Sequence, residues 1–425
     1  MVTSQADIDQ ALDEVVADSL ADIATTRQPG AAVLVTTADR SVYERAEGVI
    51  GGGDISQVTP ETTFRLGSSS KSFTGAAVMR LVDQGMLALD TTLDELVPGF
   101  RRGHEITVRM LLSHRAGLST KYPSAVGGTP PSGRQRVNDG DIAAWLHTRG
   151  PTSRLGRFVY SNAGYALLAD LVRRVSGSSF DRFMADEVFG PLGMDASWMN
   201  VEPLNGIAVP TSNRAYGHVR DQGARTHVLG DGGVCSSLRD MGEWVRANLT
   251  HDPRLLSPAS WRAMATPYEG GGSRYGLGWR VGSDGVFHHG LTAGFRSSVR
   301  VYPGYGFGVI VLRNAKTGSP SPAGLVSALA RVVKARARFL RSGSEGPMVA
   351  RLQTGLIAWE LLSAPVTARF DDATKAAVRV LQARLGLKPD GVLGPRSAWA
   401  WNAECAEREA PQLRLCLVPE LAGQT

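Results

Sequence analysis

Several features that would tie a protein to a membrane, a nucleic acid or a metal ion are absent from this sequence of 425 residues. No apolar run is long enough to cross a bilayer. No basic run or recognition motif for nucleic acid occurs, although the formal net charge is +6. The histidines lack the spacing of metal ligands. The sequence therefore predicts no membrane span, no nucleic-acid partner, no metal and no other cofactor.

The sequence also starts without the marks of secretion. Residues 1–7 (MVTSQAD) are polar and acidic, and they lack the basic and apolar regions of a signal peptide. Two explanations stay open. The chain is an exported protein shown without its leader, or it reaches its place of action by another way.

Cysteine is scarce as well, with three residues in the whole chain. Cys235 stands alone in a glycine-rich segment, where packing is a more common role than chemistry. Cys405 and Cys416 lie close together near the end of the sequence. They either form one disulfide or remain free thiols, and their spacing does not decide between the two.

Apolar periodicity and turn residues divide the chain into predictable elements. Strands near both ends and helices in the middle predict one antiparallel sheet built from the two termini, with a helical region inserted between them. A loop rich in Gly, Pro and Ser is expected at 119–140, and loops of this length are usually functional or disordered. The predicted elements include helices at 5–25 and 72–84 and strands at 31–37, 41–48, 297–302 and 306–312.

The most informative feature present is the segment 68–71 (SSSK). A Ser and a Lys three residues apart at the start of a helix lie on one face of its first turn. The amine can then take a proton from the hydroxyl, as activated-serine chemistry requires. Two further motifs follow in order, 160–162 (YSN) and 288–290 (HHG). Any one of the three occurs by chance, but the ordered set points to a serine hydrolase.

The three motifs resemble those of the class C β-lactamase and D-alanyl-D-alanine peptidase superfamily, in the form S-x-x-K, Y-x-N and H-x-G. The resemblance implies an α+β or α/β fold: an antiparallel sheet flanked by helices, with an inserted helical region, over residues 1–341. The resemblance continues in other segments, at 85–90, 96–100, 106–118, 232–237 and 275–279.

A second resemblance covers residues 349–402, which are similar to the three-helix peptidoglycan-binding domain of cell-wall hydrolases. Asp371 or Asp372 is placed to cap one of its helices. The sequence departs from that family at Leu381, often Phe, and at Ser397, usually Thr. Residues 342–348 (SGSEGPM) are predicted to be a linker, and 403–425 a tail. Trp359, Trp399 and Trp401 are candidates for glycan binding, although in so small a domain tryptophans are more often core.

The first resemblance implies catalytic roles for three residues. Ser68 would be the nucleophile that forms an acyl-enzyme, and Lys71 would accept its proton with help from Tyr160. Neither an amine nor a phenol is a good base at its free pKa of about 10, so neighbouring groups must shift both. Ser69 and Ser70 are expected to be spacers.

Other residues are expected to bind substrate. Asn162 would bond the substrate amide and help to fix Lys71. His288 would line the cleft, unless it is structural, and Gly290 would let the substrate backbone approach. The backbone amides of Ser68 and Leu291 would form the oxyanion hole. His114, in LSHRAGL at 112–118, is expected to be structural.

Together the resemblances imply a serine D,D-peptidase that acts on peptidoglycan, releasing D-Ala or opening a cross-link, while the small domain tethers it to the wall. β-Lactams would be covalent inhibitors. The alternatives are a β-lactamase or small-ester hydrolase on the same fold, or a structural protein that docks on cell walls. The place of action would be the cell wall, outside the cytoplasm. An excess of Arg over Lys suggests an actinobacterial source. The missing signal is explained either by an exported protein shown without its leader or by the virion tail of an actinobacterial phage, with other tail proteins as partners.

Overall fold

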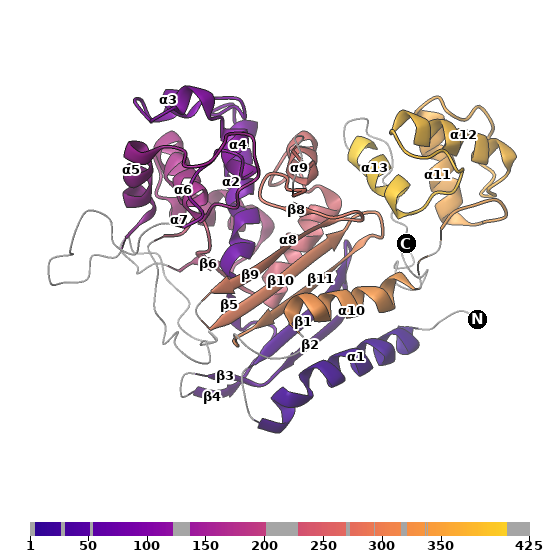
Figure 1. Ribbon diagram of the computed structural model, residues 1–425. Coiled ribbons are helices and arrows are strands. Elements are labelled where there is room, and N and C mark those ends of the chain that lie inside the picture. Colours follow the sequence, from indigo (N-terminus) through magenta and orange to yellow (C-terminus); the bar gives the residue numbers. More distant parts are fainter. Residues whose placement is uncertain are drawn as a thin grey trace.

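The large domain is built on a six-stranded antiparallel sheet with the strand order β2-β1-β11-β10-β9-β8 (Figure 1). The two strands from the start of the chain pair with four from its later part, through β1 and β11. The predicted sheet formed from both ends of the chain is therefore present. The strands are β1 (Ala31–Thr37), β2 (Ser41–Glu47), β8 (Arg280–Val281), β9 (Val286–Thr292), β10 (Phe295–Tyr302) and β11 (Phe307–Arg313).

The computed structural model describes residues 5–26, 30–51, 54–121, 137–200, 228–268, 273–292, 294–315, 321–335, 337 and 339–405. Most of the long loop predicted at 119–140 lies outside these residues. So do Cys416 and the side chain of Cys405, whereas Cys235 is buried. Within the described part of the chain, each helix is too short or too polar to span a bilayer.

The central strands β1 and β11 are buried on both faces, and alternate side chains enter two different cores. Val33 and Val35 belong to the core that the sheet shares with helices α1 (Gln5–Thr26) and α10 (Pro322–Lys334), which Figure 1 shows on one face of the sheet. Ala32 and Leu34 enter the larger core on the opposite face. Helix α1 contributes apolar residues at intervals of four, which is the spacing of one helical face: Ile8, Leu12, Val16 and Leu20.

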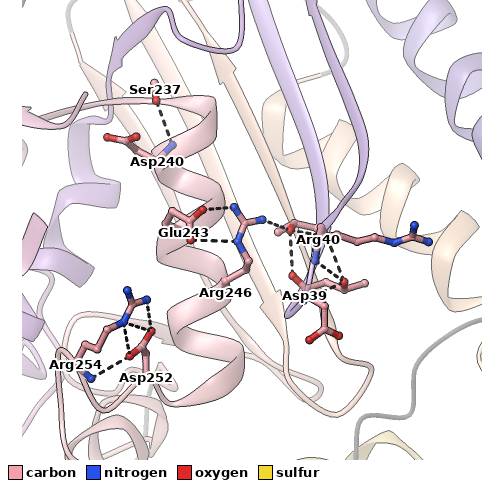
Figure 2. Close-up of polar contacts among 10 residues, drawn as sticks. Asp39, Arg40, Ser237, Asp240, Glu243, Arg246, Asp252 and Arg254 are labelled. Carbon is pink, nitrogen blue, oxygen red and sulfur yellow. Dashed lines mark hydrogen bonds and ion pairs between the residues drawn. The ribbon is translucent and has the colours of Figure 1, made fainter. Parts of the chain in front are cut away.

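Helix α8 (Leu238–Thr250) covers the other face of the sheet and is fixed to it by polar contacts (Figure 2). The Ser237 hydroxyl caps the helix by accepting from the Asp240 amide at 3.1 Å. Arg246 forms an ion pair with Glu243 and donates to the Thr36 hydroxyl of β1 at 2.8 Å. These contacts hold α8 in one orientation against the central strands.

The inserted helical region comes between the two parts of the sheet in the sequence and includes helix α2 (Ser70–Asp83), which is buried along most of its length. Small sheets accompany it: β5 (Thr63–Arg65), β7 (Val234–Ser237) and β6 (Trp198–Met199) form one, and β3 (Val49–Gly51) and β4 (Asp54–Gln57) another. The other helices of the large domain are α3 (Leu93–Leu96), α4 (Val108–Leu112), α5 (Asp139–Arg149), α6 (Asn162–Ser176), α7 (Phe180–Phe183) and α9 (Pro258–Ala265), with short turns η1 (Gly67–Ser69), η2 (Gly103–Glu105), η3 (Met184–Phe189) and η4 (Gly190–Leu192).

A small C-terminal domain of three helices has a core of its own, as the sequence predicts. Asp371 is the residue that caps the second helix, accepting from the Thr374 amide at 2.8 Å. Trp359 and Trp401 stack in the core with centroids 4.6 Å apart, and Trp399 packs against the core of the large domain. The first two tryptophans are therefore core residues. The helices are α11 (Pro347–Ala358), α12 (Asp372–Arg384) and α13 (Pro395–Cys405).

The segment 342–348, predicted as a linker, belongs to the small domain in the structure. The Gly343 amide donates to the Phe370 carbonyl at 3.1 Å, and Glu345 pairs with Arg369. Gly346 and Pro347 then start helix α11. The composition misled the prediction because Gly, Ser and Pro are typical of linkers and equally of the turn before a helix.

The structure predicts a loss of stability in acid through His251, at the end of α8. Burial lowers the pKa of this imidazole to about 4, below its usual 6.5. From pH 6.5 down to 4 the unfolded chain binds the proton and the folded chain does not, so stability present above pH 6.5 is lost as the pH falls. We expect His251→Asn to lose less stability than wild type over this range, by about 3 kcal/mol. Urea unfolding at pH 7.5 and pH 4 measures the difference, and equal losses in both proteins would contradict it.

Candidate active site

The nucleophile turn begins at Gly67, which has a left-handed backbone with φ of +54°. The next residue, Ser68, is half-buried, whereas Ser69 and Ser70 are fully buried and bonded within the protein. The Ser69 hydroxyl lies 2.8 Å from that of Ser297, and the Ser70 hydroxyl accepts from the Val234 amide at 3.0 Å. Of the three serines, Ser68 is therefore the one whose hydroxyl is available for chemistry.

Lys71 is fully buried, and its amine has three acceptors. It lies 3.4 Å from the Ser68 hydroxyl and 2.9 Å from the Asn162 side-chain oxygen, and it donates to the Asp231 carbonyl at 2.6 Å. These three acceptors match the three donors of an ammonium group. The structure therefore brings together Ser68, Lys71 and Asn162, as the sequence predicts. It also adds the backbone carbonyl of Asp231, which the sequence did not predict.

The two residues that precede Asp231 are bonded to a buried aspartate on another element. Asp139, the first residue of α5, accepts from the amides of Leu229 and Gly230 at 2.8 Å and 3.2 Å. Burial raises the pKa of Asp139 well above its usual value, although these two amides oppose the shift. In the sequence, the only signal at this position is that of a helix start, so its link to the site was missed.

Tyr160 and Asn162 flank the start of α6. Ser161 is the N-cap, since its hydroxyl accepts from the Gly164 amide at 2.9 Å. Tyr160 therefore lies just before the helix and Asn162 in its first turn, facing Lys71. The Lys71 amine lies 5.0 Å from the centre of the Tyr160 ring. Among the described residues, no hydrogen bond of the Tyr160 hydroxyl is found.

His288, on strand β9, is buried, with 1% of its surface exposed. The ring Nδ1 of His288 lies 2.9 Å from the His289 carbonyl oxygen. Because a carbonyl oxygen can only accept a hydrogen bond, Nδ1 carries the proton. Nε2 then accepts from the Tyr275 hydroxyl at 3.1 Å. Burial and the charge of Lys71 lower the pKa of His288 well below its usual value. Both nitrogens are thus engaged within the protein, and the ring supports Tyr275 from behind.

Gly290 allows strand β9 to lie directly against the nucleophile turn. A methyl group on Gly290 would be 1.8 Å from the carbonyl oxygen of Leu66. One residue further on, the Leu291 amide nitrogen would be 3.0 Å from a methyl group on Gly67. The two backbone amides expected to form the oxyanion hole, those of Ser68 and Leu291, therefore belong to segments in direct contact.

Arg280 adds positive charge to the site, and the sequence did not predict it. Its guanidinium group lies 5.5 Å from the centre of the Tyr160 ring and 5.9 Å from that of Tyr275. No pattern in the sequence marks this residue, because its place depends on the pairing of residues 275 and 280. In the part of the chain that the structure describes, no group of three or more His, Cys, Asp or Glu residues could hold a metal ion.

The fold and the family comparisons define a serine hydrolase. The family described as "Beta-lactamase" matches residues 8–333, and that described as "Putative peptidoglycan binding domain" matches residues 345–397. The chain belongs to the β-lactamase family, whose members are serine hydrolases, and it carries a second domain of the peptidoglycan-binding type. Both resemblances predicted from the sequence are confirmed.

Individual relatives agree with this family. The chain is 26% identical over 245 residues to "Putative penicillin-binding protein PbpX" of Bacillus subtilis (strain 168), covering 56% of this chain and 59% of that protein. It is 29% identical over 322 residues to penicillin-binding protein 4 of Amycolatopsis lactamdurans, covering 67% of this chain and 81% of that one. The chain thus spans less than two thirds of the length of the first.

A solved structure shows the same fold. The crystal structure of β-lactamase from Sulfitobacter sp. EE-36 matches with a TM-score of 0.64 and 23% identity, covering 78% of this chain and 99% of that chain. At this identity the likeness concerns the fold alone. The α+β fold predicted from the sequence is therefore confirmed.

The contact between β9 and the nucleophile turn predicts the effect of Gly290→Ala. The added methyl group overlaps the Leu66 carbonyl, so the strand or the turn must move. We expect a loss of about 1–3 kcal/mol in the free energy of unfolding, measured with urea. The control is Gly394→Ala, where a methyl group would meet nothing within 4 Å and a change of less than about 0.5 kcal/mol is expected. Equal stability of the two variants would contradict the contact.

Proposed function

We propose that this protein is a serine D,D-peptidase that cleaves the D-Ala-D-Ala bond of peptidoglycan stem peptides through an acyl-enzyme. The observation that carries the proposal is the position of the Lys71 amine, between the hydroxyl of Ser68 and fixed acceptors on Asn162 and Asp231. The second domain supports the choice of substrate, because it belongs to a family described as peptidoglycan-binding.

The geometry around Lys71 suits the first proton transfer. A neutral amine has two N–H donors, and two fixed acceptors are present in Asn162 and the Asp231 carbonyl. Its lone pair then faces the Ser68 hydroxyl, 3.4 Å away. The proton passes from Ser68 to Lys71 as the oxygen attacks the substrate carbonyl carbon, with the Tyr160 hydroxyl alongside as the second proton carrier.

The remaining steps complete the transfer of the acyl group. The carbonyl oxygen becomes an oxyanion, which the Ser68 and Leu291 amides stabilise. The C–N bond breaks, and the departing D-Ala amine takes the proton from Lys71 or Tyr160. Water, deprotonated by the same groups, then attacks the ester and restores the Ser68 hydroxyl. Asn162 bonds the substrate amide, and the exposed edge of β9 after His288 borders the substrate, with His288 acting from behind.

The same nucleophile would open the ring of a β-lactam, because its strained amide carbonyl presents the same electrophile. Two of the relatives are named as penicillin-binding proteins, which supports β-lactams as covalent inhibitors of this chain. A β-lactamase is the second candidate, favoured by the fold shared with a protein of that name. The rate at which the acyl-enzyme hydrolyses separates the two, since an inhibitor complex persists and a β-lactamase complex does not.

We infer that the protein acts at the bacterial wall, outside the cytoplasm, because its second domain is of the peptidoglycan-binding type. Two routes to the wall are considered: export of a bacterial protein, and delivery on the tail of an actinobacterial phage. Mass spectrometry of purified virions distinguishes these routes. Peptides of this chain in the virion would support delivery by a phage, and their absence would contradict it.

The peptidase proposal predicts release of D-Ala from a muramyl pentapeptide by the intact protein, and none by Ser68→Ala. The matched control is Ser69→Ala. Its hydroxyl is buried against Ser297, so we expect this variant to stay within about tenfold of the wild-type rate. An amino-acid assay for D-Ala measures all three proteins.

Three outcomes of this assay would count against the proposal. Release by Ser68→Ala would remove Ser68 from the mechanism, and loss in Ser69→Ala alone would move the nucleophile by one residue. If no protein releases D-Ala but a chromogenic β-lactam is turned over rapidly, the chain is a β-lactamase.

A further inference from the structure

His114 has an unusual backbone for a residue with a side chain. It lies in the turn after α4 with φ of +61°, in the left-handed region, and 2% of its surface is exposed. Such a conformation is uncommon outside glycine and costs free energy. Its ring Nε2 is buried, with no hydrogen-bond partner among the described residues. Both features destabilise the folded protein, so His114 must contribute other interactions that compensate for them.

The benefit is found in the hydrogen bonds of His114, which hold the chain on both sides of Tyr160. The carbonyl of His114 accepts from the Val159 amide at 2.9 Å. Its ring Nδ1 accepts from the Ser161 amide at 3.0 Å. The chain is therefore held by one residue at Val159, just before Tyr160, and at Ser161, just after it.

The ring of His114 also contacts the side chain that it brackets. Its centroid lies 4.3 Å from that of Tyr160 and 4.6 Å from that of Tyr275, and the two tyrosine rings also contact each other. Burial and the charge of Lys71 lower the pKa of His114 well below its usual value, so the ring stays neutral. A neutral ring leaves the Nδ1 lone pair free to accept from Ser161, with the proton on Nε2.

We propose that His114 is a positioning residue for Tyr160, fixing its backbone on both sides and its ring on one face, so that the phenol hydroxyl meets the substrate beside Lys71. From the left-handed turn, a single residue presents both its carbonyl and its ring to the segment 159–161. The proposal rests on the proposed function, in which Tyr160 carries a proton during acylation.

The test compares variants of the intact protein by their rate of acylation with a fluorescent penicillin, per active site titrated by adduct mass. His114→Ala removes the ring and its acceptor, and we expect the rate to fall about 10- to 100-fold. His114→Asn keeps an acceptor in the place of Nδ1 and tolerates the left-handed backbone, so it should recover part of this loss.

The matched control is His251→Ala. His251 is also a buried histidine with a left-handed backbone, φ of +53°, and a ring nitrogen without a partner among the described residues. It stacks on Trp261 and has no contact with Tyr160. We expect this variant to lose stability, while its acylation rate per active site stays within about twofold of wild type.

A double mutant separates positioning from a general structural role. In the background of Tyr160→Phe the hydroxyl is already lost, so adding His114→Ala should slow acylation by less than about twofold. A further loss as large as in the wild-type background would overturn the proposal, and so would an unchanged rate in His114→Ala when Tyr160→Phe is slow. A wild-type rate in Tyr160→Phe, or a wild type that forms no adduct, would instead overturn the proposed function and the positioning role with it.

Discussion

The burial of the Lys71 amine is the constraint on which the rest of the site depends. A charged or polar group removed from water is costly unless each of its donors finds an acceptor. The three acceptors here come from three separate parts of the chain: the nucleophile turn, the start of α6 and the segment before β7. These three segments must therefore be assembled together before the amine is satisfied. This requirement couples the fold to the chemistry.

Close contact between backbones makes this assembly possible. Gly290 brings β9 against Leu66, and Gly75 of α2 lets that helix approach the segment that carries Tyr275 and Arg280, since a methyl group at Gly75 would lie 2.6 Å from the Leu277 carbonyl. A side chain at either glycine would separate the nucleophile helix from its neighbours. The glycines thus act through the distance between elements, in addition to any contact with a substrate.

The sequence predicted those features of the site that depend on local spacing. Ser68 and Lys71 share one face of a helical turn, so this pair can be found from neighbouring residues. Tyr160 and Asn162 were identified through the resemblance to the family motif. The sequence could not predict the role of the Asp231 carbonyl, because every residue has a backbone carbonyl. Nor could it predict the hydrogen bonds from the Leu229 and Gly230 amides to the buried Asp139. His114 was assigned a structural role because its value lies in two bonds to residues more than forty positions away. The place of His288 behind Tyr275 likewise depends on tertiary packing. The roles of these residues in catalysis stay predictions.

The most direct measurement of the central claim is the acylation of Lys71→Met by a fluorescent penicillin, followed by the mass of the intact protein. Methionine keeps much of the volume of the buried side chain and removes the group that accepts the Ser68 proton. We expect acylation about 10²- to 10⁴-fold slower than in wild type, with the adduct still on Ser68. A folded Lys71→Met protein that is acylated at the wild-type rate would contradict the account, because the buried amine would then have no part in activating the serine.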